Sequence, residues 1–235
     1  MSEIALSIDE VTSGYKASVV LRKLSLSVAD GEAVALLGKN GMGKTTLLKT
    51  IMGYLPKLGG AVHVHGQDIT RLAPHRIARS GVAYAPQEHA LFQDLSIRDN
   101  LRLGLERASL FDERFAGIEA IFPVFGSRLR QYAGTLSGGE QKMLLVARAL
   151  MMRPSIILLD EITEGLQPLV IERLAQALLW ERVHHKTTLL LIEQNVPFAL
   201  KVADRYAVLK QGEIIDEGDA KDAAAAQRIF GHLRV

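Results

Sequence analysis

The chain of 235 residues contains no cysteine. Disulfide bonds and thiolate metal sites are therefore excluded, and the fold must be held by a core, which a chain of this length can bury as one large domain. No stretch approaches 18 uninterrupted apolar residues, and the first residues, MSEIALSIDE, lack the basic and then apolar pattern of a secretory signal. We therefore expect a chain that neither spans a membrane nor is exported by the general route.

An excess of charge of one sign is also missing. The 28 lysines and arginines nearly balance the 26 acidic residues, which leaves a formal net charge of +2, and both signs are mixed along the chain. A protein that binds nucleic acid through its phosphates usually presents a basic face, because the release of counterions drives that binding. A nucleic-acid partner is therefore not expected.

Four short apolar runs have the character of buried strands. They are AVALL (33–37), VAYA (82–85), SIILL (155–159) and TLLLI (188–192), and segments with helical periodicity separate them. This alternation predicts an α/β fold with a mainly parallel sheet and flanking helices. An apolar stripe that begins at Val170 predicts an amphipathic helix over one face of the sheet.

Two further patterns predict how the domain is divided. IALSIDEV and LSLSV, near the start, alternate like half-buried strands and indicate an antiparallel β subdomain beside the main sheet. Strand patterns are missing from residues 88–152, where helical segments indicate an inserted α-helical subdomain. We therefore expect a single domain over residues 1–235, in which residues 1–87 and 153–235 form the core with its antiparallel part.

A glycine-rich loop follows the first apolar run. Gly38, four further residues and then Gly43, Lys44 and Thr45 form the Walker pattern between a strand and a helix, a context in which an ordinary glycine-rich turn is the weaker alternative. Glycines let backbone N–H groups approach phosphate oxygens, and the start of the helix adds a positive dipole end. We predict a P-loop NTPase fold (RecA-like) and a MgATP site with these contacts: Gly38, Asn40, Gly41, Gly43, Lys44, Thr45 and Thr46.

The chemistry of the loop side chains supports the same ligand. Lys44 can reach the β- and γ-phosphates as a positive charge, and the Thr45 hydroxyl is an oxygen ligand suited to Mg²⁺. Asp160 and Glu161 directly follow the run SIILL. They therefore lie at the carboxyl end of a buried strand, where α/β proteins bind ligands.

We expect the two acids to divide the work, because adjacent residues of a strand point to opposite sides. Asp160 would hold the Mg²⁺ shell, and Glu161 would orient or deprotonate the attacking water. A helix cap and a solvated carboxylate are the alternative for such a pair, and the preceding phosphate loop favours catalysis.

The segment TLSGGEQKMLLVARALMMRPSIILLDE resembles the signature region of the ATP-binding-cassette (ABC) family. Within it, a serine followed by glycines opens a helix, which by itself is a good phosphate site. The chain then carries two phosphate-binding helix ends for one nucleotide. The resemblance implies a head-to-tail dimer, in which one subunit's signature closes over the nucleotide on the other's loop. The signature contacts would be Ser137, Gly138, Gly139 and Glu140.

The resemblance implies further functional positions. Tyr15 lies where the family carries an aromatic that stacks on adenine, although an ordinary tyrosine at a strand end is the alternative. Gln87, after VAYAP, resembles the glutamine that contacts Mg²⁺ and the attacking water, and it joins the sheet to the helical insert. Because the family's insert contacts the membrane subunit, His89 to Asp99 is the expected docking surface.

Within the family, TEGLQP (163–168) and LIEQNVPFALKVADRYAVL (191–209) are similar to ATPase subunits of importers for branched-chain amino acids, urea and short amides. This resemblance implies a subunit that hydrolyses ATP to energise uptake through separate transmembrane permease subunits. A second ABC ATPase, identical or different, and indirectly a solute-binding protein would be partners. The expected location is cytoplasmic, on the inner face of the cell membrane.

The alternative function is a soluble ABC-type ATPase that acts as an ATP-driven switch on nucleic acid or ribosomes. DNA-repair relatives place a long coiled coil between the two motifs, and the heptads it needs are missing from this sequence. Ribosome-associated relatives usually carry two cassettes in one chain, whereas this sequence has one Walker loop and one signature.

The sequence departs from the wider family at three places. Gln194 stands where a histidine usually senses the γ-phosphate, and the importer branch named above also resembles this chain in having glutamine there. Ile162 replaces the usual proline after the catalytic acid, and residues 165–168 replace a stretch that usually ends in aspartate at the dimer interface. The last two differences concern communication between the two sites of a dimer more than the chemistry.

We predict slower turnover with Gln194 than with histidine, because glutamine can hydrogen-bond a phosphate oxygen but can neither carry positive charge nor relay a proton. Gln194→His should therefore raise the steady-state ATPase rate, measured as phosphate release at saturating MgATP. An unchanged rate would contradict this prediction.

Overall fold

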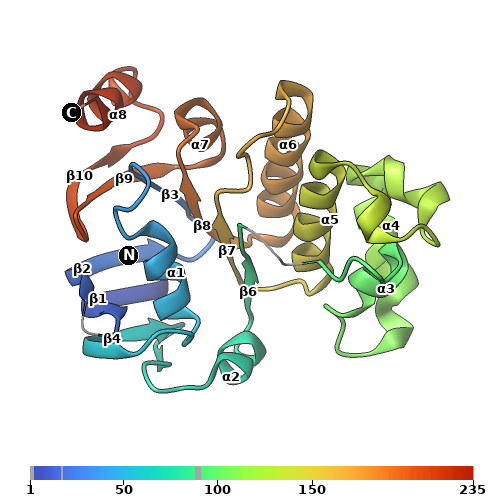
Figure 1. Cartoon of the computed structure of the whole chain (residues 1–235), viewed down its shortest axis with the longest axis horizontal. Helices are drawn as coiled ribbons and strands as arrows, with labels where there is room; N and C mark the ends of the chain where they lie inside the picture. Colours follow the sequence, from blue (N-terminus) through green and yellow to red (C-terminus); the bar gives the residue numbers. More distant parts are fainter. Residues whose placement is uncertain (1–2, 17, 88–90, 235) are drawn as a thin grey trace.

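The computed structural model describes residues 3–16, 18–87 and 91–234. Two β-sheets and a set of helices make up the fold, which confirms the α/β class (Figure 1). Within the described residues no helix is long and apolar enough to cross a membrane.

The larger sheet carries the strands predicted from the four apolar runs. Its spatial order is β10 (Glu213–Asp219), β9 (Arg205–Lys210), β3 (Ala33–Leu37), β8 (Thr188–Glu193), β7 (Ile156–Asp160) and β6 (Val82–Ala85). The strands from β9 to β6 are parallel, and β10 is antiparallel to β9. The expected run 155–159 is displaced by one residue, so Asp160 is the last residue of β7.

The smaller sheet forms the antiparallel part that the alternating patterns predict. Its order is β2 (Ser18–Ala29), β1 (Ile4–Tyr15), β4 (Lys57–Val64) and β5 (Gln67–Asp68). Neighbouring strands in this sheet are antiparallel. In Figure 1 the sheet lies on the same side of the molecule as α1 (Lys44–Ile51), away from the helical insert.

The parallel strands separate two hydrophobic cores, because successive side chains of a strand point to opposite faces. In β7, Ile156 and Leu158 belong to the core shared with α1 and the smaller sheet, whereas Ile157 and Leu159 face the other core. Helices α5 (Gly138–Met151), α6 (Pro168–His185) and α7 (Val196–Val202) contribute to that other core. Two further helices outside the insert are α2 (Pro74–Arg79) and α8 (Ala225–Leu233).

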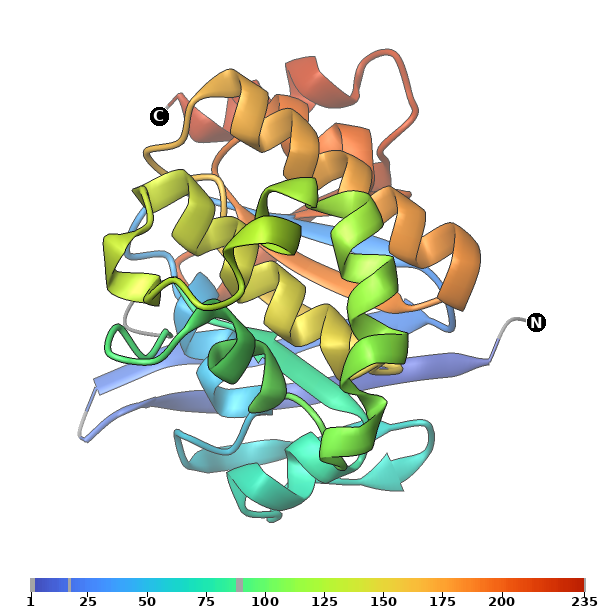
Figure 2. The same cartoon turned by 90° about the vertical axis from the view of Figure 1, so that its right-hand side faces the viewer.

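Helices occupy the chain between β6 and β7, as the sequence predicts. They are α3 (Ile97–Arg102), η1 (Ala108–Leu110), α4 (Phe111–Ile121), η2 (Pro123–Arg128), η3 (Ala133–Thr135) and α5, and Figure 2 views this insert from the front. Phe115 and Phe125 from the insert share one core with the sheet residues Leu159 and Leu191. The insert is therefore packed onto the sheet by a continuous apolar core.

The core predicts which leucines stabilise the fold. Leu158 on β7 is fully buried, whereas Leu58 on β4 is 58% exposed. Leu158→Ala should lower the free energy of unfolding by about 2–5 kcal/mol, because it removes buried apolar surface and leaves a cavity. Leu58→Ala, the matched control, should change it by less than about 0.5 kcal/mol. Urea unfolding measures both values, and equal effects would contradict this account of the core.

Candidate active site

Backbone constraints shape the loop between β3 and α1. A Cβ atom on Gly38 would lie 2.6 Å from the Leu209 carbonyl oxygen, so the loop passes too close to β9 for a side chain. Gly43 has φ +103°, in the left-handed region that favours glycine, and α1 begins at the next residue. Among the described residues, no side chain caps this helix start. Its first N–H groups can therefore receive an anion.

Lys44 is buried under this loop and makes three polar contacts. Its ammonium group donates to the carbonyl oxygens of Gly38 at 2.7 Å and Lys39 at 3.0 Å. It also forms an ion pair of 2.9 Å with Glu161 Oε1, and only 3% of its side chain is exposed. A phosphate that reaches this ammonium group would compete with Glu161 for it.

Asp160 is held by two hydroxyl groups. Thr45 Oγ1 donates to Asp160 Oδ1 at 3.0 Å, and Tyr84 Oη donates to Asp160 Oδ2 at 3.1 Å. Burial raises the pKa of the Asp160 carboxyl, while these two hydrogen bonds oppose the shift. A hydroxyl and a carboxylate in contact are the hard oxygen donors that Mg²⁺ prefers, so this pair fits the expected cation.

Glu161 lies at the centre of the polar cluster. Its backbone N–H donates to the Ile192 carbonyl oxygen at 2.8 Å, and its φ is +46°. Because β7 ends at Asp160, this left-handed turn sets the direction of the Glu161 side chain. The two acids do make separate contacts, but the expected reason, the alternation of a strand, is wrong.

Two glutamines complete the contacts of Glu161. Gln194 Nε2 donates to Glu161 Oε2 at 2.9 Å and to Asn40 Oδ1 at 2.6 Å. Gln87 Nε2 lies 3.3 Å from the same Glu161 oxygen and donates to Glu164 Oε2 at 2.6 Å. Thus segments that are far apart in the sequence meet at one carboxylate, as the expected catalytic set of Glu161, Lys44, Gln87 and Gln194 requires.

A cavity of about 400 Å³ opens beside this cluster. It is lined by Tyr15, Val20, Asn40, Gly41, Gly43, Lys44, Thr45, Thr46, Gln87 and Glu161. Tyr15, at the end of β1, is 44% exposed, as a ring available for stacking has to be. The signature residues do not line this cavity, so a nucleotide bound there would need a second chain to reach a signature.

The signature begins α5 with a capping box. Ser137 Oγ accepts from the Glu140 backbone N–H at 3.4 Å, and Glu140 Oε2 accepts from the Ser137 N–H at 2.9 Å. Arg128 pairs with Glu140, and its hydrogen bond lowers the pKa of that carboxyl. A Cβ on Gly138 would meet no atom of the described residues within 4 Å. Packing within this chain therefore does not require glycine at position 138.

Sequence reasoning missed three residues of the site. Tyr84 belongs to the run VAYA, which was interpreted only as an apolar strand, although a polar residue in such a run is itself a signal. Glu193 directly follows the run TLLLI and was quoted only within the motif LIEQNVPFALKVADRYAVL. Glu164 was quoted only within the motif TEGLQP. A second cavity, of about 390 Å³, is lined by Asn40, Glu161, Thr163, Glu164, Glu193, Gln194 and Asn195.

The sequence and the fold both have known counterparts. Residues 21–164 match the profile described as "ABC transporter". The chain is 36% identical to the high-affinity branched-chain amino acid transport ATP-binding protein BraG of Pseudomonas aeruginosa, over 89% of this chain and 91% of that protein. It is 35% identical to the probable branched-chain amino acid transport ATP-binding protein LivF of Archaeoglobus fulgidus, over 91% of each chain.

A solved structure supports the same fold. The crystal structure of a nucleotide-free ATP-binding cassette from an ABC transporter superposes with a TM-score of 0.86. The match covers 97% of this chain and 95% of that one, at 24% sequence identity.

Glu193 predicts how stability depends on pH. Its carboxylate, 2% exposed, accepts hydrogen bonds from the N–H and hydroxyl groups of Thr163, and burial raises its pKa from 4.5 to about 7. Between these values the folded state binds more protons than the unfolded chain, so the free energy of unfolding should fall as pH rises.

Glu193→Gln should remove the contribution of Glu193 to this fall in the free energy of unfolding, which is on the order of 3 kcal/mol. Urea unfolding of both proteins at several pH values between about 5 and 8 measures the difference. Glu106 is exposed and provides the control substitution Glu106→Gln. For this control, the free energy of unfolding should depend on pH as it does in the wild type. Parallel curves for wild type and Glu193→Gln would contradict the prediction.

Proposed function

The chain belongs to the ABC transporter family, and we propose that it is the ATP-hydrolysing subunit of an importer. It would energise the uptake of a branched-chain amino acid, or of a similar small solute such as urea or an amide, through separate membrane subunits. The similarity to BraG and LivF over about nine tenths of each chain supports an amino-acid solute. These two relatives do not favour the alternative, an ATP-driven switch on nucleic acid or ribosomes.

The observation that carries the catalytic proposal is the set of contacts around Glu161. A γ-phosphate bound at Lys44 would take the ammonium group from Glu161 Oε1, which is now 2.9 Å away. The released oxygen could then accept a hydrogen bond, and later a proton, from the attacking water. Gln194 and Gln87 would keep the other carboxylate oxygen in place.

Mg²⁺ is the cation that the site would hold together with ATP, where it supplies positive charge to the phosphates. Thr45 and Asp160 provide the contacting oxygens, with Gln87 nearby on the cavity wall. Tyr15 would stack on adenine at the rim of the same cavity. These assignments rest on hard oxygen donors and on the position of each side chain.

A dimer would complete the site. The nucleotide cavity of this chain is not lined by its own signature residues, Ser137, Gly138, Gly139 and Glu140. The open space at Gly138 leaves room for a phosphate of a nucleotide that is bound to another subunit. Ser137 and the N–H groups that open α5 would hold that phosphate. Glu140 would act through the capping box, since its carboxylate is taken up by Ser137 and Arg128.

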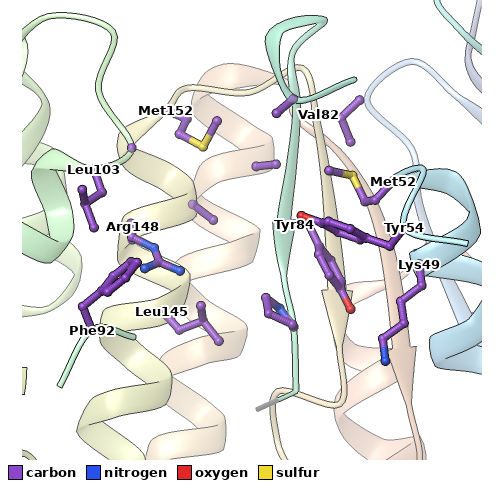
Figure 3. A pocket seen from close by; sticks show the side chains of 15 residues that line it. Lys49, Met52, Tyr54, Val82, Tyr84, Phe92, Leu103, Leu145, Arg148 and Met152 are labelled. Atoms are coloured by element: carbon purple, nitrogen blue, oxygen red, sulfur yellow. The ribbon is translucent and has the colours of Figure 1, made fainter. Parts of the chain in front are cut away.

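The membrane partner has a candidate docking groove. A cavity of about 550 Å³ lies where the insert meets the edge strand β6, and Figure 3 shows Phe92, Leu103 and Arg148 on one side of it. More than half of the Phe92 and Leu103 side chains is exposed. The surface expected from sequence, His89 to Asp99, contributes Phe92 to the groove, whereas His89 lies outside the described residues.

Charge indicates what the permease segment should carry. Arg148 is partly buried, which lowers its pKa, and its guanidinium has no hydrogen bond or ion pair with any residue of the described ranges. We therefore expect a short permease segment with an apolar anchor for the groove and a carboxylate for Arg148.

Two further assignments belong to this proposal. Residues 1–87 and 153–235 would form the ATPase core and residues 88–152 the signature subdomain, since β6 and β7 bracket the helices. The subunit would work at the inner face of the cell membrane, where ATP is available and the permease exposes its cytoplasmic loops. A solute-binding protein would then act on the opposite side.

One experiment tests the proposal. Tagged protein carrying Glu161→Gln, which should trap the ATP-bound dimer, is purified from gently solubilised membranes of its own cells in MgATP. We expect multi-span permease subunits, with or without a second cassette, and binding of branched-chain amino acids by the accompanying solute-binding protein. Recovery of only soluble or nucleic-acid-associated proteins would overturn transport.

The same purification tests the groove. Leu103→Asp should reduce permease recovery at least about tenfold, because it places a charge in an apolar contact. Leu58→Asp, at a leucine of similar exposure on β4, is the matched control and should have no effect. Equal recovery with both variants would overturn docking in the groove.

A further inference from the structure

One side chain joins the docking groove to the cation site. Tyr84 lines the groove with its ring, and its hydroxyl group donates to Asp160 Oδ2 at 3.1 Å. Figure 3 shows Tyr84 next to Tyr54 on the side of β6 that faces α1, opposite Arg148 and Leu145. No motif in the sequence marks Tyr84, and the catalytic proposal above does not use it.

The sheet register explains this contact. In the parallel pair β6–β7, Tyr84 is the partner of Leu158, and Asp160 lies two residues further along β7. Side chains two residues apart on a strand share a face, so Leu158 and Asp160 point to the same side as Tyr84. The long tyrosine side chain can therefore cross from the edge strand to the carboxylate at the end of its neighbour.

Two elements thus hold the two oxygens of one carboxylate. Thr45, in the first turn of α1, bonds Asp160 Oδ1, and Tyr84 on β6 bonds Oδ2. The Thr45 hydroxyl group can offer a lone pair to a cation and still donate its hydrogen to Asp160 Oδ1. Tyr84 fixes the other oxygen, so the two hydroxyl groups together set how the carboxylate is turned, and the structure shows only these two side-chain hydrogen bonds to Asp160 within the described residues.

The same ring is accessible to whatever fills the groove. The rings of Tyr54 and Tyr84 have centroids 6.4 Å apart and an interplanar angle of 43°. Tyr54 is 57% exposed, and both tyrosines line the groove. Contact with this pair would move the Tyr84 hydroxyl group most, because it is the atom farthest from the backbone.

We propose that Tyr84 is a positioning residue that orients Asp160 for Mg²⁺ and transmits occupation of the groove to the cation site. Only the identity of the natural occupant, a permease segment, rests on the proposed function. Coupling between two sites is reciprocal, so the bound cation should also change the affinity of the groove for its occupant.

The first test compares Tyr84→Phe with Tyr54→Phe. Each removes one hydroxyl group from a tyrosine whose side chain lines the groove, but of the two only Tyr84 donates to Asp160. Mn²⁺, as a probe for Mg²⁺, is titrated by electron paramagnetic resonance with a saturating non-hydrolysable ATP analogue. We expect about tenfold weaker Mn²⁺ binding for Tyr84→Phe, as for loss of an outer hydrogen bond to a ligand. Tyr54→Phe should bind as wild type, and equal affinities in all three proteins would overturn the positioning role.

The second test uses the absence of cysteine from the chain. Tyr54→Cys introduces a single thiol into the groove, which a bulky maleimide then fills. We expect the label to change Mn²⁺ affinity at least about threefold when Tyr84 is present, and to have no effect when Tyr84→Phe is combined with it. The same change in both backgrounds, or no change in either, would overturn transmission through Tyr84.

These outcomes are separable from the transport proposal, because no permease is present. If neither titration gives the expected change in Mn²⁺ affinity, the role of Tyr84 is overturned, while a permease should still be recovered. If no permease is recovered, transport is overturned, while the expected Mn²⁺ affinities stay the same. Urea unfolding of each variant shows whether the substitution has changed the stability of the fold as well.

Discussion

The buried ion pair between Lys44 and Glu161 joins the two halves of the site, and the geometry around it depends on this contact. Lys44 follows the loop after β3, and Glu161 follows β7, yet their charged atoms are 2.9 Å apart with almost no exposure. Taking two charges out of water costs free energy, which is offset only when both partners are close and otherwise hydrogen-bonded. Loop carbonyls satisfy Lys44, and Gln87 and Gln194 satisfy Glu161, so each neighbour of the pair is also held in place.

The sheet order makes this convergence possible. Strands β3, β8 and β7 are adjacent and parallel, so the segments that follow them emerge at the same edge of the sheet. The phosphate loop, Gln194 and Glu161 come from these three neighbouring strand ends. Gln87 arrives from β6, the edge strand, where the chain enters the helical insert. The site therefore lies where the insert can act on it, and the groove beside β6 is the place where another protein could reach both.

Tyr84 shows how a position in the sheet can give an ordinary residue a function. On the edge strand, its ring faces the groove and its hydroxyl group faces Asp160, the proposed ligand of the cation. A shorter side chain at position 84 could line the groove but would not reach the end of β7. The proposed coupling needs no long pathway, because one side chain contacts both sites.

The fold class, the glycine-rich loop before Lys44 and the residue types of the candidate site could be predicted from the amino-acid sequence. Local patterns carry this information: apolar runs specify buried strands, and the glycine spacing before Lys44 specifies a backbone that can approach phosphate. The folded structure was needed to show which side chains meet at Glu161, that a left-handed turn sets the direction of the Glu161 side chain, and that Tyr84, Glu164 and Glu193 lie at the candidate site. Such contacts depend on strand order and register across the sheet, which periodicity along one strand does not encode.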